Sequence, residues 1–244
     1  MSELRPGERI DDLQRSNLKI IQDPAKFCFG MDAVLLSGFV SVKRGGRVTD
    51  LCTGSGIIPL LLSAKTEAAE IKGIEIQAEM VDMAARSVRL NTLEGKVHIV
   101  RGDLRDSAVS GESGSQDVVT CNPPYMRAGE GVVNPDSARA IARHELCGRL
   151  EEIVQVSARL LKNGGRACFV YRPNRLIELI SAMRGCGLEP KRMKLVHPFA
   201  ERDANMVLLE AVKGGRCFLT VEPPVIVFQS PGVYSREIRE IYGY

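Results

Sequence analysis

Four consecutive residues, Asn122-Pro123-Pro124-Tyr125, combine a side-chain amide, two prolines and an aromatic ring. They follow the apolar run 117–121, whose length and composition predict a buried strand. A central strand cannot continue through the prolines, because proline lacks the backbone N–H that pairs with a neighbouring strand. At the end of a strand, the segment would present acceptor oxygens and a ring to a flat, nitrogen-bearing substrate. The alternative is a proline turn with a surface tyrosine.

A turn with two glycines, Asp50-Leu51-Cys52-Thr53-Gly54-Ser55-Gly56, lies between a predicted strand at 47–51 and a predicted helix at 57–64. Glycines at such a turn let the backbone approach a ligand closely. Two glycines alone are weak evidence, because tight strand-to-helix turns often need glycine for their own geometry.

Two further acidic residues follow the next two predicted strands. Glu75 ends the strand at 71–75, where α/β nucleotide-binding proteins place an acid that holds the ribose hydroxyls. Asp103 follows the strand at 97–100, and its carboxylate could accept hydrogen bonds from an adenine amino group. Each residue alone has an ordinary alternative: a solvated charge for Glu75 and a turn residue for Asp103.

The combination of these residues is more specific than its parts. Asp50 with the glycines, Glu75, Asp103 and Asn122 all fall at the carboxyl ends of predicted strands, which is where open parallel sheets bind ligands. A dinucleotide phosphate site would favour the spacing G-x-G-x-x-G, whereas position 59 is Pro59. The pattern therefore favours a nucleoside ligand without phosphates, such as S-adenosylmethionine.

Strands and helices alternate along the central part of the chain, which predicts a doubly wound, mostly parallel α/β sheet. Asn163-Gly164-Gly165 is expected to end one of the helices. The further predicted helices span 77–92, 149–161 and 174–184, and the further predicted strands span 167–171, 191–197 and 205–212.

The chain is predicted to have three parts. Residues 1–46 form a small β/α appendage, with two strands around Asp23-Pro24 (18–22 and 27–30) and a helix at 31–40. Residues 47–214 form the main domain, and residues 215–244 form edge strands or a tail. The segment 126–142 lacks an apolar pattern and is expected to be a mobile lid.

Composition limits the class of protein. Of 244 residues, 44% are hydrophobic and 26% are charged, and the net charge of +3 permits a polyanionic partner without requiring one. The chain has no stretch of eighteen apolar residues and its first eight residues are not a signal peptide, so we expect no membrane span. Seven cysteines without a C-x-x-C pair are expected to be reduced, and three separated histidines give no metal pattern. We therefore expect a cytoplasmic protein without a metal; the sequence does not set its oligomeric state.

These motifs resemble those of class I S-adenosylmethionine-dependent methyltransferases that modify amino nitrogens. The lead-in Phe29-Gly30-Met31-Asp32-Ala33-Val34-Leu35-Leu36 and the stretch Ala142-Arg143-His144-Glu145 are similar to one branch, the bacterial tRNA adenine-N6 methyltransferases of the tRNA1(Val) type. The resemblance covers roughly residues 15–212. It implies a Rossmann-like, mostly parallel sheet of seven strands, the class I methyltransferase fold, and a tRNA substrate methylated on adenine 37 beside the anticodon.

The resemblance also implies roles for individual residues at the cofactor. Asp50 and the glycine turn would contact the methionine end of S-adenosylmethionine, Glu75 the ribose, and Asp103 the adenine amino group. The cofactor-binding residues expected in this way are Met31, Asp32, Asp50, Cys52, Gly54, Gly56, Glu75, Ile76, Asp103, Leu104 and Asn122.

At the acceptor, the resemblance implies that Asn122 and the carbonyl of Pro123 accept hydrogen bonds from the target amine. Pro124 completes the motif, and Tyr125 would stack on the target base. Two alternatives remain open: a protein-glutamine methyltransferase with the same motif, and a non-catalytic RNA-binding module on the same fold. The run Lys191-Arg192-Met193-Lys194 either contacts phosphates or forms a solvated face.

Overall fold

A central mixed sheet organises the structure, a computed structural model that describes residues 4–26, 28–123 and 149–243. Seven long strands of this sheet lie in the order β5-β4-β3-β6-β7-β9-β8. Their bounds are Arg47–Leu51 (β3), Glu70–Glu75 (β4), Val97–Arg101 (β5), Gln116–Cys121 (β6), Leu161–Tyr171 (β7), Leu188–His197 (β8) and Met206–Lys213 (β9). The pairs from β5 to β7 are parallel, and β9 runs antiparallel to β7 and β8. The prediction of a mostly parallel α/β sheet is therefore confirmed.

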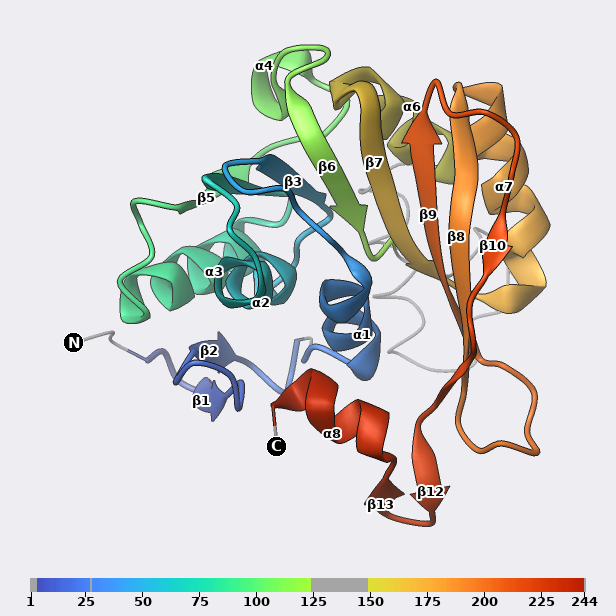
Figure 1. The fold of residues 1–244 in the computed structure, drawn as a ribbon. Helices are drawn as coiled ribbons and strands as arrows, with labels where there is room; N and C mark the ends of the chain where they lie inside the picture. Colours follow the sequence, from blue (N-terminus) through green and yellow to red (C-terminus); the bar gives the residue numbers. More distant parts are fainter. Residues whose placement is uncertain (1–3, 27, 124–148, 244) are drawn as a thin grey trace.

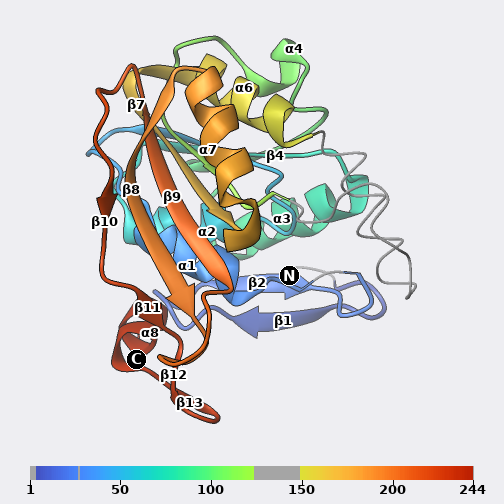
Figure 2. The same cartoon turned by 90° about the vertical axis from the view of Figure 1, so that its right-hand side faces the viewer.

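Helices cover both faces of the sheet (Figures 1 and 2). One face packs against α1 (Met31–Phe39), α2 (Ile57–Lys65) and α3 (Ala78–Leu90), and the other against α6 (Leu150–Leu160) and α7 (Leu176–Gly185). Alternation along β6 separates the two cores, because Val118 faces the first and Val119 faces the second. A single turn of helix, α4 (Ser107–Ser110), follows β5, and a 3₁₀ turn (Pro173–Arg175) precedes α7.

The amino-terminal strands differ from the prediction. A hairpin forms between β1 (Arg9–Asp12) and β2 (Lys19–Gln22), and β2 packs against α3. The hairpin loop has Gln14, Ser16 and Asn17 at positive φ, whereas residues 28 and 29 are not in a strand. The predicted strand at 18–22 is confirmed as β2, but the turn at Asp23-Pro24 does not lead into a second strand at 28–30, and β2 pairs instead with the preceding β1. The loop between β1 and β2 contains neither glycine nor proline to mark it.

The start of β7 also differs from the prediction. Helix α6 ends at Leu160, and the next residue, Leu161, is already extended (φ −70°, ψ 140°) and pairs with Gln116 of β6. Asn163-Gly164-Gly165 therefore lies inside the strand and does not end the helix. Gly164 has φ +76°, where the register shifts between the pairs Gln116–Leu161 and Val118–Arg166.

The carboxyl-terminal residues extend the sheet and then cross to α1. Two short strands, β10 (Thr220–Val221) and β11 (Val225–Ile226), pair with β8, and a hairpin of β12 (Phe228–Ser230) and β13 (Val233–Tyr234) leads into α8 (Arg236–Tyr242), which packs on α1 (Figure 1). Arg192 pairs with Glu222 at 2.6 Å, and Lys194 pairs with Glu237 at 3.3 Å. This basic run of β8 thus holds the carboxyl-terminal segment by ion pairs.

Two further expectations concern membranes and cysteines. Within the described ranges, no helix has the length and apolar character needed to cross a bilayer. The six cysteines in those ranges are all free thiols. Pro124, Tyr125, the predicted lid at 126–142, and His144 and Glu145 lie outside the described residues.

Candidate active site

Strand register brings the residues predicted to carry chemistry to one edge of the sheet. Leu51, the last residue of β3, pairs with Ile74 of β4 and with Cys121, the last residue of β6. Glu75 at the end of β4 in turn pairs with Arg101 at the end of β5. The residues that follow these strands therefore leave the sheet from the same edge. The expectation that they share one edge is confirmed.

The glycine turn after β3 has a tightly wound backbone. Cys52, Gly54 and Gly56 have φ of 57°, 56° and 80°, a region that residues with a side chain rarely adopt. Gly56 is also the residue that precedes α2, and a Cβ atom there would lie 3.0 Å from the Cβ of Ala84 in α3. Glycine is needed at position 56 both for its backbone conformation and for helix packing.

Glu75 is buried and both of its carboxylate oxygens accept hydrogen bonds from backbone N–H groups, so it is not a solvated charge at a strand end. Only 3% of the surface of Glu75 is exposed to solvent. Oε2 accepts a hydrogen bond of 2.9 Å from the N–H of Gly54, and Oε1 accepts 3.0 Å bonds from the N–H groups of Ile76 and Gln77. The carboxylate thus fixes the glycine turn of β3 to the turn that follows β4.

Asp50 is a buried acid with one oxygen satisfied. The hydroxyl of Thr120 on β6 donates to its Oδ1 at 2.6 Å. Its Oδ2, and the nearby hydroxyls of Thr53 and Ser55, are buried without a hydrogen-bond partner among the described atoms. The pKa of Asp50 is raised to about 7, mainly by burial; the charge of Glu75 acts in the same direction, and the hydroxyls of Thr120 and Thr53 oppose it. Buried polar atoms without partners are rare in folded proteins, so this carboxylate oxygen and the two hydroxyls, which can all accept hydrogen bonds, favour a ligand that donates hydrogen bonds or carries positive charge.

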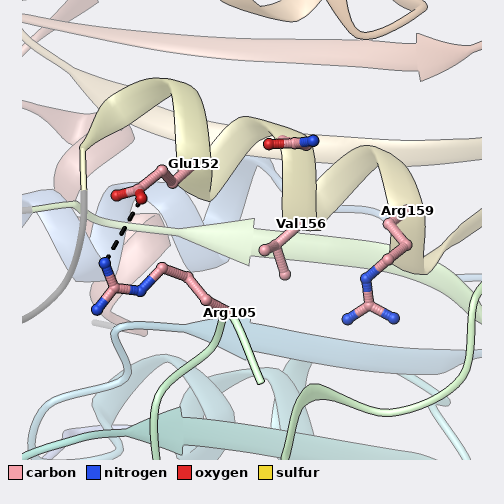
Figure 3. Close-up of a pocket in the computed structure, with 5 residues that line it drawn as sticks. Arg105, Glu152, Val156 and Arg159 are labelled. Carbon is pink, nitrogen blue, oxygen red and sulfur yellow. Dashed lines mark hydrogen bonds and ion pairs between the residues drawn. The ribbon is translucent and has the colours of Figure 1, made fainter. Parts of the chain in front are cut away.

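Asp103 is held by an arginine that the sequence analysis did not single out. Arg105 donates from Nε to Oδ1 at 2.9 Å and from Nη2 to Oδ2 at 2.6 Å, and this guanidinium keeps the pKa of Asp103 below its ordinary value. Arg105 also lies 3.5 Å from Glu152 of α6, and both side chains line a cavity of about 310 Å³ (Figure 3). In the sequence, the one feature that points to Arg105 is its position two residues after Asp103. The residue types alone do not reveal that the two side chains form an ion pair. Leu104 between them is buried in the core beneath α6.

Asn122 follows β6 and contacts the first turn of α1. Its amide Nδ2 donates to Oδ2 of Asp32 at 2.9 Å, and the N–H of Ala33 donates to Oδ1 of the same carboxylate at 2.9 Å. Asn122 is half-buried and Pro123 is buried, while Met31, the first residue of α1, packs against the core. Asp32 and Asn122 are ninety residues apart in sequence. The sequence analysis named both residues but not their contact.

The described site is strongly acidic. Asp32, Asp50, Glu75 and Asp103 all present carboxylates at or near the same edge, and Arg105 pairs with Asp103. A cation-bearing ligand would reduce the repulsion among these groups. The arrangement suits a positively charged nucleoside better than a phosphate-bearing one.

A doubly wound sheet with a glycine turn after its first strand and acids after the next two defines the class I methyltransferase fold. The family model described as "Methyltransferase small domain" matches residues 17–184. The match covers well over half of the chain, which therefore belongs to this family of methyltransferases.

Two curated relatives share one activity in their names. A tRNA1(Val) (adenine(37)-N6)-methyltransferase of Tolumonas auensis is 28% identical over 186 residues, which cover 72% of this chain and 75% of the relative. A protein of the same name from Aeromonas salmonicida is 26% identical over 208 residues, which cover 84% of each chain.

Solved structures share the fold. The crystal structure of a predicted O-methyltransferase, protein Atu636 from Agrobacterium tumefaciens, has a TM-score of 0.71 and 24% identity, and the match covers 87% of this chain and 95% of that chain. P. horikoshii TYW2 in complex with MeSAdo has a TM-score of 0.61 and 16% identity, with 86% and 73% covered. At these identities the likeness shows the fold alone.

Proposed function

We propose that this methyltransferase transfers a methyl group from S-adenosylmethionine to the N6 amino nitrogen of an adenine in tRNA, near the anticodon. The observation that carries the proposal is the position of Asn122 at the end of β6, beside the acidic edge formed by Asp50 and Glu75. The names of the curated relatives support the choice of tRNA and of adenine. A protein that modifies tRNA in this way would work in the cytoplasm.

The residues of the glycine turn fit the proposed cofactor. The unsatisfied acceptors Asp50 Oδ2, Thr53 Oγ and Ser55 Oγ suit the ammonium group at the methionine end, and Glu75 suits the ribose hydroxyls. Asp103, in the loop after β5, suits the adenine amino group. In this proposal, Ile76 and Leu104 are the apolar residues beside the adenine ring. When bound, S-adenosylmethionine supplies a methyl group on a positively charged sulfur, which is already activated for displacement.

The protein's task is to make the acceptor nitrogen reactive. An adenine amino nitrogen shares its lone pair with the ring and is a poor nucleophile. The side-chain oxygen of Asn122 and the carbonyl of Pro123 accept hydrogen bonds from this amine, which favours a pyramidal nitrogen and stabilises its developing positive charge. Holding the nitrogen in line with the methyl group can contribute up to roughly 7–11 kcal/mol.

The target base must leave its stack to reach this edge. Unstacking costs a few kcal/mol in a duplex and less in a single-stranded loop, which favours a loop nucleotide. In our proposal Tyr125, with Pro124 before it in the sequence, stacks on the base and returns about 1–3 kcal/mol.

A transfer assay tests the proposal directly. The protein is incubated with labelled S-adenosylmethionine and, separately, total RNA and total protein from cells that lack its gene, so that the acceptor sites are unmethylated. The labelled RNA is digested to nucleosides and analysed by mass spectrometry. Label in N6-methyladenosine is the expected result. Label in protein glutamine would replace the proposed substrate, and no label in either fraction, with cofactor binding intact, would favour a binding module without activity.

A further inference from the structure

We infer that Asp32 is a positioning residue that orients the side-chain amide of Asn122, so that its oxygen and not its nitrogen faces the acceptor. The inference rests on the proposed function, because it concerns the acceptor side of the same site. Its starting observation is the 2.9 Å hydrogen bond from Asn122 Nδ2 to Asp32 Oδ2.

The chemistry of the two groups sets the orientation of the amide. An ionised carboxylate accepts hydrogen bonds and donates none, so only the nitrogen of Asn122 can face Asp32. The amide oxygen then points away from Asp32 and remains an acceptor. A rotated amide would place its oxygen against the carboxylate and its NH₂ against the target amine, and both contacts would be repulsive. A hydrogen bond to a charged acceptor is also stronger than a neutral one, so it polarises the amide and makes its oxygen a better acceptor.

The carboxylate of Asp32 is itself held in place. Its Oδ1 accepts from the N–H of Ala33 at 2.9 Å, which leaves Oδ2 directed at Asn122. The helix behind it is firmly packed, because Ala33 to Leu36 are all buried against α2 and the sheet. Asp32 therefore acts from a rigid element and needs no movement to orient the amide.

Gly30 provides the space that this arrangement needs. Its backbone (φ −99°, ψ 178°) is open to any residue, so glycine is not required there for conformation. A Cβ atom at position 30 would instead lie 2.7 Å from Asp32 Oδ1. Alanine at this position would push the carboxylate out of place without removing it. Gly30, Asp32 and Asn122 thus form one unit across the amino end of α1 and the carboxyl end of β6.

The first test exchanges the two partners. Asn122→Asp places two carboxylates against each other, and Asp32→Asn removes the charged acceptor; each single variant should lose up to about 10²-fold in the single-turnover rate. The double variant D32N/N122D restores one donor and one acceptor, and again leaves an oxygen toward the target amine. We expect its rate to recover to within about tenfold of the wild type. A double variant as slow as the product of the two single losses would overturn the inference, because it would show no coupling between the residues.

Cofactor affinity separates positioning from a direct cofactor contact. Binding of S-adenosylhomocysteine, measured by calorimetry, should change by less than about threefold in Asp32→Asn. A loss of affinity as large as the loss of rate would mean that Asp32 acts on the cofactor, and the inference would be wrong.

A spectroscopic measurement does not depend on activity. In protein with ¹⁵N-labelled asparagine, the side-chain NH₂ signal of Asn122 is assigned by its loss in Asn122→Ala. The signal should move in Asp32→Asn and in Gly30→Ala, and should be unchanged in Gly95→Ala, where a Cβ would meet nothing within 4 Å. An unmoved signal in both Asp32→Asn and Gly30→Ala would refute the contact even if the methyl acceptor proved to be something other than tRNA. Failure of the transfer assay with this signal behaving as expected would instead refute the proposed function alone.

Discussion

The carboxylate of Glu75 and the backbone N–H of Gly54 form a hydrogen bond of 2.9 Å that joins the turn after β4 to the turn after β3. Both turns belong to the proposed cofactor site. Three more N–H donors, two from the backbone and one from the side chain of Gln77, converge on the other oxygen of the same carboxylate. Glu75 is therefore part of the architecture of this site, in addition to any contact it makes with ribose.

This arrangement predicts that Glu75→Gln destabilises the protein even without cofactor. Glutamine replaces one acceptor oxygen by an NH₂ group, which leaves a buried N–H without a partner and costs about 1–3 kcal/mol. Urea unfolding in the absence of cofactor measures this loss, and calorimetry with S-adenosylhomocysteine should show weaker binding.

Glu70→Gln is the matched control for that measurement. Glu70 begins the same strand, and its ion pair with Arg47 at 3.2 Å is exposed. Its removal should cost less than about 1 kcal/mol. Equal losses in the two variants would contradict a special role for Glu75 in holding the turn.

Asp50 predicts a dependence of stability on pH. Burial raises its pKa from 3.8 to about 7, so the folded state favours the protonated form. The free energy of unfolding is therefore highest, with respect to this group, below pH 3.8, and it falls as the pH rises through about 7, by at most about 4 kcal/mol. Urea unfolding of the cofactor-free protein between pH 5 and pH 8 should show the fall in the wild type and a smaller one in Asp50→Asn.

Thr120 provides an independent check on Asp50. Its hydroxyl donates to Oδ1 at 2.6 Å and so favours the ionised acid. Thr120→Val removes this donor and should raise the pKa of Asp50 in the folded state, so the fall in stability should continue to a higher pH. Thr120→Ser keeps the hydroxyl and should leave the upper end of the fall unchanged. For the same reason, affinity for a cation-bearing cofactor should rise between pH 6 and pH 8, as Asp50 becomes ionised. An equal slope with pH in the wild type and in Asp50→Asn would show that another group is responsible.

The sequence predicted the parts of the fold that depend on burial. Strands β3, β4, β5 and β6 and helices α1, α2 and α3 were placed within one or two residues of their bounds, because each buries a regular set of apolar residues. The shared location of Asp50, Glu75 and Asp103 could be predicted from these strands, since parallel strands have their carboxyl ends at the same edge of the sheet. The two-residue strands β10 and β11 have too little pattern of their own to be located in this way.

Contacts between distant side chains could not be predicted in the same way. The bonds from Asn122 to Asp32 and from Thr120 to Asp50 join residues 90 and 70 positions apart, and no local pattern specifies them. The β1–β2 hairpin was misplaced for a related reason, because Leu13 and Leu18 close its loop across residues that include neither glycine nor proline. Packing of the hairpin against α3 supports this loop from outside it.

A comparison of alanine substitutions at two glycines with positive φ distinguishes the cost of backbone strain from the cost of steric contact. Gly56 has φ +80° and a close neighbour in Ala84, whereas Gly45 has φ +74° and open space around it. Alanine at either position should cost about 1–2 kcal/mol for the backbone. Gly56→Ala should lose about 1–3 kcal/mol more through overpacking against α3. It should also lose cofactor affinity, which Gly45→Ala should retain. Thermal unfolding and calorimetry on both variants check this difference; equal stability losses would show that the contact with Ala84 relaxes without cost.

Asn122→Ala should separate chemistry from cofactor binding. The change removes the amide oxygen that we propose accepts from the target amine, and loss of one such interaction typically costs about 10²–10³-fold in rate. The glycine turn that we propose holds the cofactor follows β3 and is joined by Gly54 to Glu75 at the end of β4, so it does not depend on this side chain. Calorimetry should therefore give a dissociation constant for S-adenosylhomocysteine within a few fold of the wild type, while single-turnover methyl transfer falls sharply. Asn163→Ala makes the same change at an exposed position of β7 and should leave both quantities unaltered. Turnover at the wild-type rate in Asn122→Ala would show that the acceptor amine is held by other groups and would remove Asn122 from the proposed mechanism.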